Sequence, residues 1–226
     1  MWIEIQKAFS LLFGQDDELR QILFLTLKMS LFSTGISTIA GVTAAVLSAV
    51  TPAYPIKRYA GWLINTLMGT PPVAAGLIVF LMLSRNGPLG QLGLLYTIDA
   101  MVIAQVFLIA PIVTGLSSPV LEKKYEETKE TFWGLNIGGR RKVFLLLQEC
   151  RKPLAGIILS AFGRSIAEVG AVQLVGGNVQ YKTRVMTTAI MLETNRGNFQ
   201  LAVSLGMVLL LCSFIVNSLA GMILEK

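Results

Sequence analysis

The stretch FQLAVSLGMVLLLCSFIVNSLAGMI, residues 199–223, contains no charged side chain. A helix of about 20 predominantly apolar residues is long enough to cross the hydrocarbon core of a bilayer. The whole chain shares this character: 54% of its 226 residues are hydrophobic and only 14% are charged, whereas an ordinary soluble domain has about 25% charged residues. The composition therefore predicts an all-α, polytopic membrane protein and excludes a disordered chain and a disulfide scaffold.

Four further apolar stretches predict membrane spans. They are residues 19–50, 58–84, 98–117 and 153–175. The first is too long for a single crossing unless part of it stands outside the bilayer. Together with residues 199–223, these stretches predict five transmembrane helices in a single domain that covers residues 1–226.

The N-terminal residues do not resemble a secretory signal, because they lack a basic head and polar side chains interrupt the apolar ones. Trp2, Ile5, Phe9 and Leu12 instead recur at helical spacing. This pattern predicts an amphipathic helix that lies on the membrane surface.

Lys and Arg are distributed unequally between the two sides of the predicted membrane. Eleven of them follow the first or third span or end the chain, and six lie on the opposite side. Since cytoplasmic segments carry the excess of Lys and Arg, the N-terminus is expected outside and the C-terminus in the cytoplasm. An odd number of spans agrees with termini on opposite sides.

Several kinds of catalytic and metal site are excluded by the residues that are missing. The chain has no His, and Cys150 and Cys212 do not form a CxxC motif. His-based triads and metal sites are therefore excluded, and a Cys-based metal site is disfavoured. The phosphate loop G-x-x-x-x-G-K-[ST] is also absent. We expect no metal, no cofactor and no enzymatic activity in this chain.

Residues 118–152 carry eight Lys or Arg and five Asp or Glu, unlike the apolar stretches around them. We expect a helix over 126–135 and a second helix over 140–151. A turn between them is marked by Gly134, Asn136, Gly138 and Gly139, residue types that tolerate a left-handed backbone. On the second helix one apolar face is expected to lie along the inner membrane surface; it consists of Val143, Leu146, Leu147 and Cys150.

This segment resembles the cytoplasmic "EAA" loop of ABC importer permeases, whose pattern is Glu-Ala-Ala, three residues, then Gly. Here the pattern becomes Glu130-Thr131-Phe132, three residues, then Asn136, so it departs at both alanines and at the glycine. The stretch FGRSIAEVGAVQLVGGN, residues 162–178, and MTTAI, residues 186–190, resemble the molybdate/tungstate permease group, and most closely its tungstate-transport branch.

The resemblance implies the type I ABC importer permease fold in a bacterial or archaeal cytoplasmic membrane. It implies a homodimer of this subunit, two ATPase subunits that hold ATP and Mg, and an extracytoplasmic oxyanion-binding protein. By the same resemblance the cytoplasmic loop is a coupling helix that docks on the ATPase. The residues implied in this coupling are Glu130, Thr131, Phe132, Leu135, Asn136, Gly138 and Gly139.

Tungstate is the cargo that the resemblance favours, and molybdate is the alternative. Sulfate, thiosulfate and phosphate are further rivals, because these oxyanions are similar in shape. An ATP-independent channel or secondary carrier is a different class of alternative. Secondary carriers often show repeated halves, and we find no internal repeat here.

Five residues in or beside the spans are candidates for the pathway or gate, and each has a structural alternative. Arg164 and Glu168 stand four apart on the fourth span and share a helical face, so that they form either a pathway pair or an internal ion pair. Lys28 either attracts an anion or sits in the solvated outer part of the first span. Pro71 and Pro72 break the second span, either to line the pathway or as a packing kink.

Overall fold

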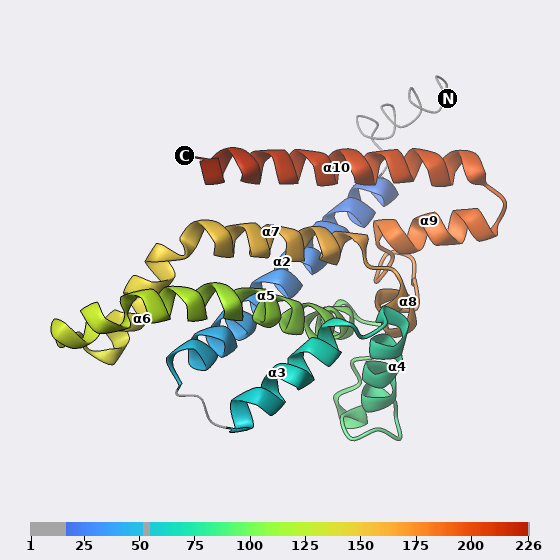
Figure 1. Cartoon of the computed structure of the whole chain (residues 1–226). Helices are drawn as coiled ribbons and strands as arrows, with labels where there is room; N and C mark the ends of the chain where they lie inside the picture. The colour runs from blue at the N-terminus through green and yellow to red at the C-terminus, as the bar shows by residue number, and fades with distance from the viewer. Residues whose placement is uncertain (1–16, 52–54, 226) are drawn as a thin grey trace. The chain divides into compact units, whose positions relative to one another are not determined.

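The computed structural model describes residues 17–51 and 55–225, and the amphipathic helix predicted for the N-terminus lies outside them. Every regular element in these residues is a helix (Figure 1), which confirms the predicted all-α class. The elements are α2 (Asp17–Val50), α3 (Pro55–Met68), α4 (Pro72–Leu83), the short 3-10 helix η1 (Gly90–Leu92), α5 (Ile98–Gly134), α6 (Gly139–Glu149), α7 (Arg151–Ala167), α8 (Gly170–Gly176), α9 (Met186–Asn195) and α10 (Phe199–Glu225).

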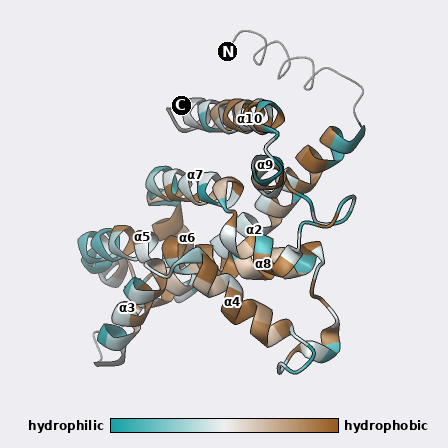
Figure 2. Ribbon diagram, turned by 90° about the vertical axis from the view of Figure 1, so that its right-hand side faces the viewer, coloured by the Kyte–Doolittle hydropathy of each residue, from teal (hydrophilic) through white to brown (hydrophobic). Residues whose placement is uncertain are grey.

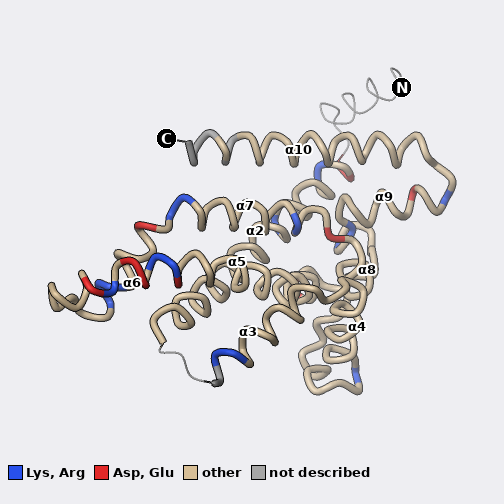
Figure 3. The backbone as a smooth tube through the Cα atoms, in the orientation of Figure 1, with Lys and Arg blue, Asp and Glu red and all other residues tan. Residues whose placement is uncertain are grey.

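Three of the described helices, α2, α5 and α10, are long and apolar enough to cross a membrane by themselves. Two further pairs, α3 with α4 and α7 with α8, satisfy the same criterion together but are sharply bent at a short break. If each bent pair is one span, the described chain has up to five crossings, the number that the sequence predicts. Figure 3 shows α10 without charged residues along nearly its whole length.

The second span breaks where the sequence predicts, at Gly69-Thr70-Pro71. Pro72 occupies the first turn of α4, where its missing N–H removes no helical hydrogen bond. Pro71 before it has an extended backbone (φ −59°, ψ 133°), because the ring of a following proline disfavours the helical region. The helix that follows is wholly apolar, and Figure 2 shows it in brown along most of its length.

The third span differs from the prediction. The helix expected over 126–135 is the last part of α5, which runs without interruption from Ile98 to Gly134, with Pro111 and Pro119 inside it. Between residues 117 and 133 the sequence has no Gly or Asn that could end a helix. At 1.5 Å per residue, 37 residues span about 55 Å, so the end of α5 extends well beyond a hydrocarbon core of about 30 Å.

The described residues group into two compact units. The first contains residues 17–33, Pro71–Gln105 and 162–225, and the second contains Thr34–Thr70 and Val106–Ala161. Each unit has its own hydrophobic core, described below.

In the first unit α9 packs antiparallel to α10, and α4 packs against α8 (Figure 1). One core cluster joins the start of α2 to α9 and α10 through Leu19, Met186 and Val208, all of which are buried. A second cluster includes Met29 of α2 and Met101 of α5. The apolar faces of α2 and α9 are thus buried within this unit.

In the second unit α2 and α5 run in the same direction. Gly41 lies so close to α5 that a Cβ there would come within 2.8 Å of Val113. Further along both helices, Ser48 Oγ donates a hydrogen bond of 2.8 Å to Glu122 Oε1. A parallel pair is required if the first and third spans cross from the same side, as the charge distribution predicts.

The apolar face of α6 packs inside the second unit. Leu146 and Cys150 are buried in one cluster with Ala45 of α2 and Leu121 of α5. The prediction that this face lies along the membrane surface is therefore wrong. The turn at residues 135–138 returns the chain alongside α5, where helix packing buries the same side chains.

Candidate functional site

The predicted coupling residues lie at the far end of α5 and in the turn to α6. Asn136 has a left-handed backbone (φ 48°), as its type allows. The backbone N–H of Leu135 donates to the carbonyl of Thr131 (3.0 Å), and that of Ile137 donates to the carbonyl of Phe132 (3.0 Å). These bonds close the helix end, so the sequence correctly predicts the position and chemistry of the turn.

Adjacent side chains at this helix end point in opposite directions. Phe132 is only 6% exposed, and its ring centroid lies 6.4 Å from that of Tyr125. Trp133 and Leu135 are 77% and 68% exposed. Glu130 and Thr131 are also exposed. Phe132 therefore supports the helix end from inside, while Trp133, which sequence reasoning missed, offers the larger apolar surface.

One ion pair joins α6 to the end of α5, where Figure 3 shows blue and red residues gathered. Lys124 Nζ lies 3.3 Å from Glu149 Oε2. One turn of α5 further on, Lys129 donates a hydrogen bond to Glu126, which raises the pKa of Lys129. Burial raises the pKa of the Cys150 thiol, so this thiol stays protonated and weakly nucleophilic at neutral pH.

The breaks in the second and fourth spans meet in the first unit. α4 begins at Pro72 and α8 at Gly170, and the two helices pack together. A Cβ on Gly170 would come within 2.8 Å of Val73 Cγ2, and a Cβ on Gly76 within 2.6 Å of the Cα of Ala171. Glycine at both positions permits this close backbone approach, as small residues do between membrane helices.

Glu168 lies in the break itself, where α7 and α8 are bent by 55°. Its side chain is buried, and Oε1 accepts a hydrogen bond of 3.1 Å from the backbone N–H of Ala171 in the first turn of α8. Its carbonyl accepts a hydrogen bond of 3.0 Å from Thr187 Oγ1 of α9. A carboxylate at a helix N-terminus is stabilised by the unpaired N–H groups and the helix dipole.

Arg164 lies on the other side of this break and is exposed. Among the described residues no ion pair joins it to Glu168. The prediction that the two share a helical face is wrong, because α7 ends at Ala167 and the i, i+4 relation holds only in a continuous helix. The alternative of an internal ion pair is overturned by the same geometry.

A buried polar cluster joins three spans beside the same break. Gln105 Oε1 of α5 accepts hydrogen bonds from Ser33 Oγ of α2 (2.6 Å) and Ser165 Oγ of α7 (2.9 Å). Gln105 Nε2 donates to the carbonyl of Ser165 (2.8 Å). That carbonyl lies in the last turn of α7, where the helix supplies no regular partner. Sequence reasoning missed this cluster, although Gln105 is the sole amide side chain between residues 98 and 117.

Lys28 is on the exposed side of α2. No ion pair or hydrogen bond within the described part of the chain joins Lys28 or Arg164 to another predicted pathway residue. The structure thus brings Pro72 and Glu168 into one neighbourhood, through Val73 and Gly170.

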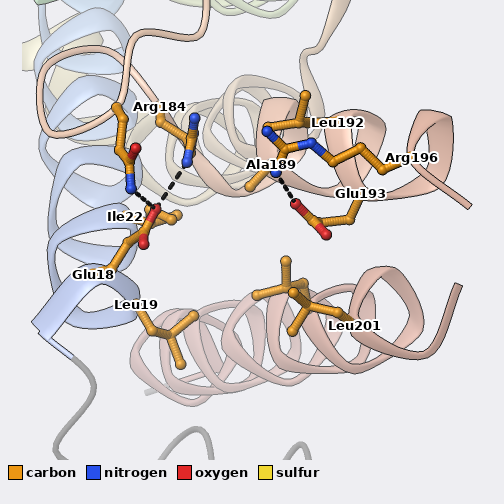
Figure 4. A pocket seen from close by; sticks show the side chains of 11 residues that line it. Glu18, Leu19, Ile22, Arg184, Ala189, Leu192, Glu193, Arg196 and Leu201 are labelled. Carbon is orange, nitrogen blue, oxygen red and sulfur yellow. Dashed lines mark hydrogen bonds and ion pairs between the residues drawn. The ribbon is translucent and has the colours of Figure 1, made fainter. Parts of the chain in front are cut away.

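A pocket of about 220 Å³ opens between the start of α2, the residues before α9, and the helices α9 and α10 (Figure 4). Glu18 Oε1 accepts hydrogen bonds from Arg184 Nη1 (2.8 Å) and Gln180 Nε2 (3.0 Å). On the α9 side, Arg196 Nη1 pairs with Glu193 Oε1 (3.0 Å). Leucine side chains of α10 complete the lining. The helix α9 (Met186–Asn195) supplies one wall of this pocket.

No family model matches the chain, but curated proteins do. It is 34% identical over 219 residues to the "Tungstate uptake system permease protein TupB" of Peptoclostridium acidaminophilum, a match that covers 97% of this chain and 96% of that protein. It is 38% identical over 164 residues to the protein of the same name from Campylobacter jejuni subsp. jejuni serotype O:2, covering 73% of this chain and 69% of that protein.

A solved structure has the same fold. It belongs to a bacterial ABC transporter involved in the import of the acidic polysaccharide alginate, and the comparison gives a TM-score of 0.75 at 16% identity. The match covers 97% of this chain and 82% of that one. At this identity the likeness concerns the fold alone, and it agrees with the sequence matches. The chain belongs to the tungstate uptake branch of the ABC transporter permeases, which are multi-pass membrane proteins.

Proposed function

We propose that this chain is the membrane-spanning subunit of an ATP-driven importer whose cargo is tungstate. The observation that carries the proposal is the 34% identity to a tungstate uptake permease over nearly the full length of both chains. The chain has no phosphate loop, so ATP is hydrolysed by a partner subunit. An extracytoplasmic binding protein delivers the oxyanion.

The end of α5 transmits the movement of the ATPase. Two copies of this chain pair with two ATPase subunits, and each copy inserts its coupling residues into one ATPase. The exposed side chains of Glu130, Trp133 and Leu135 make the contact, while buried Phe132 fixes their position. Because α5 is one continuous helix from the membrane to this tip, closure of the ATPases rocks the span directly and opens the two sides in alternation.

The pocket beside α9 lies on the outer face and belongs to the surface that receives the binding protein. This assignment follows from the orientation that the Lys and Arg distribution predicts. Its two ion pairs and apolar lining provide both charge and shape for recognition.

Reconstitution tests the proposal. The permease, with the ATPase and binding protein encoded beside it, is placed in proteoliposomes, and ATP hydrolysis and uptake are measured with tungstate, molybdate, sulfate and phosphate. Stimulation by tungstate at far lower concentration than by the other anions is the expected result. Equal stimulation by molybdate would mean that the importer carries both oxyanions. No stimulation by any oxyanion would overturn the proposed function.

A charge-reversal variant tests the coupling contact in the same assay. Glu130→Lys should lower uptake and its coupling to ATP hydrolysis while membrane insertion stays normal. Gln148→Lys is the control, because Gln148 is exposed on α6 outside the coupling residues. Unchanged uptake in Glu130→Lys would count against the docking role.

A further inference from the structure

We propose that a groove in the second unit binds one anionic phospholipid, which goes beyond the transport function. The groove lies between α2, α3 and α5 and has a volume of about 1040 Å³. Neither the coupling residues nor the span breaks line it. Its lining has an apolar part, which suits the acyl chain of a lipid, and a charged end, which suits the headgroup.

The apolar part can take an acyl chain. Leu47 of α2 and Trp62 and Ile64 of α3 contribute to its walls. Gly61 also lines it, and a Cβ on Gly61 would meet no atom within 4 Å. Further along, α3 and α5 touch where Met68 and Ile64 lie against Gly115. The groove is thus open beside Gly61 and narrows where the two helices meet.

The charged end has an excess of positive charge. Glu122 Oε1 lies 3.0 Å from Lys57 Nζ and accepts a hydrogen bond from Ser48 Oγ, so its charge is already compensated. Arg58 lies over the ring of Trp62, 5.0 Å from the centroid. No carboxylate among the described residues lies within ion-pair distance of Arg58. This guanidinium is therefore available to a phosphate oxygen.

The position of the groove favours a lipid over a dissolved anion. Tyr59 and Trp62 are 61% and 55% exposed and lie edge to face, with ring centroids 5.5 Å apart. Exposed aromatic rings beside basic residues are typical of the membrane interface. Basic pockets between helices on the cytoplasmic side bind anionic lipid headgroups. A mostly apolar groove gives no advantage to inorganic phosphate.

Fluorescence quenching of Trp62 tests the proposal in the assembled transporter. Trp2→Phe and Trp133→Phe leave Trp62 as the single tryptophan of this chain, and the tryptophans of the partner subunits are also replaced by Phe. Vesicles contain a rising fraction of phosphatidylglycerol or phosphatidylcholine that carries bromine on its acyl chains. We expect brominated phosphatidylglycerol to quench Trp62 at a severalfold lower fraction than brominated phosphatidylcholine, and inorganic phosphate at constant ionic strength to leave this unchanged.

Two variants separate the headgroup from the chain. Arg58→Gln should reduce the preference for the anionic lipid about fivefold, the effect of one basic residue near a charged surface, and Arg58→Lys should restore part of it. Gly61→Leu should fill the groove and reduce quenching by both lipids. The controls are Lys123→Gln, an exposed cation of α5 that does not line the groove, and Gly35→Leu, a glycine of α2 with equally open surroundings. Neither control should change the quenching.

Three results would overturn the proposal. Equal quenching by the two lipids, unaffected by Arg58→Gln, would mean contact with bulk lipid alone. Loss of quenching on addition of phosphate would mean a site for dissolved anions. The third result is quenching of Trp62 in the permease alone but not in the assembled transporter. It would mean that another subunit covers the groove. All three are independent of the cargo, so they leave the proposed transport function intact.

Discussion

Gln105, Glu168 and Thr187 all bond to backbone groups at the interruption of the fourth span. In a bilayer an unsatisfied N–H or C=O group costs several kcal/mol, because no water can replace the lost partner. An interrupted helix at membrane depth is therefore stable only if side chains supply the missing bonds. These three residues do so from α5, from the break itself and from α9.

Replacement of Gln105 tests this account. Gln105→Leu removes the partner of the Ser165 carbonyl and of two hydroxyls, so we expect a loss of about 1–2 kcal/mol in stability. The measurement is unfolding of the purified protein in detergent. Thr114→Val is the control, since the partner of the Thr114 hydroxyl in the described part of the chain is the Ala110 carbonyl of its own helix. An equal loss in both variants would argue against a special role for Gln105.

Arg164 gives a contrasting expectation. It is exposed and unpaired within the described chain, so Arg164→Ala should change the unfolding midpoint little. We expect tungstate uptake to fall, because an unpaired cation in a span is retained at a cost and favours an anionic cargo. Arg20→Ala, which removes an exposed cation near the start of α2, serves as control. Normal uptake with Arg164→Ala would remove Arg164 from the pathway.

At the level of elements, two neighbouring residues at the end of α5 have different roles. Phe132 stabilises the helix end, and Trp133 contacts the ATPase in the proposed function. Phe132→Ala should lower stability by about 3 kcal/mol, because it leaves a cavity beside Tyr125. Trp133→Ala should leave the unfolding midpoint unchanged and weaken the coupling of ATP hydrolysis to uptake. Both variants are compared by thermal unfolding and by the reconstituted transport assay. Equal thermal loss in the two variants would contradict the division of roles.

Gly76 is one of the two glycines that let α4 and α8 pack closely. Gly76→Leu places a side chain against the backbone of Ala171, where even a Cβ would come within 2.6 Å. We expect a loss of about 1–3 kcal/mol or more from this overpacking, seen as a lower unfolding midpoint. Gly156→Leu on α7 is the control, because a Cβ there meets no atom within 4 Å. If the two variants unfold alike, the close approach does not limit the packing.

For the whole molecule, the orientation can be tested by labelling from outside. In a background with Cys150 and Cys212 replaced by Ser, Asn198→Cys should react with a membrane-impermeant maleimide in intact cells. Thr131→Cys should react only after the cells are opened. Both positions are exposed, so access to the reagent decides the result. The reverse pattern would invert the proposed orientation.

The sequence predicts the helical class, the spans and the break in the second span because each rests on a local property, either apolar length or proline. The turn at Asn136 follows from the same kind of signal. The break in the fourth span after Ala167 was not predicted. Polar partners from distant segments cannot be predicted in this way. Gln105 meets Ser165 across 60 residues, and Glu18 meets Arg184 across 166.

The two wrong predictions, the shared face of Arg164 and Glu168 and the membrane-facing side of α6, failed because contacts with distant segments decide both features. Arg164 and Glu168 have helical spacing, but the bend that separates them is held by bonds from Gln105 and Thr187 on other helices. The apolar face of α6 fits a membrane surface or a helix equally well. Its burial was decided by α2 and α5, which supply Ala45 and Leu121.

The shortness of α4 has a consequence for synthesis at the ribosome. Twelve residues give a helix of about 18 Å, well under the roughly 30 Å of hydrocarbon. The preceding α3 carries Lys57 and Arg58 in its first turn. The partner of Gly76 is Ala171, which is translated 95 residues later (171 minus 76). At about 5–20 residues per second this is a delay of about 5–20 s. During that interval the second span waits in the translocon or the lipid without its partner, exposed to the proteases that remove unassembled segments.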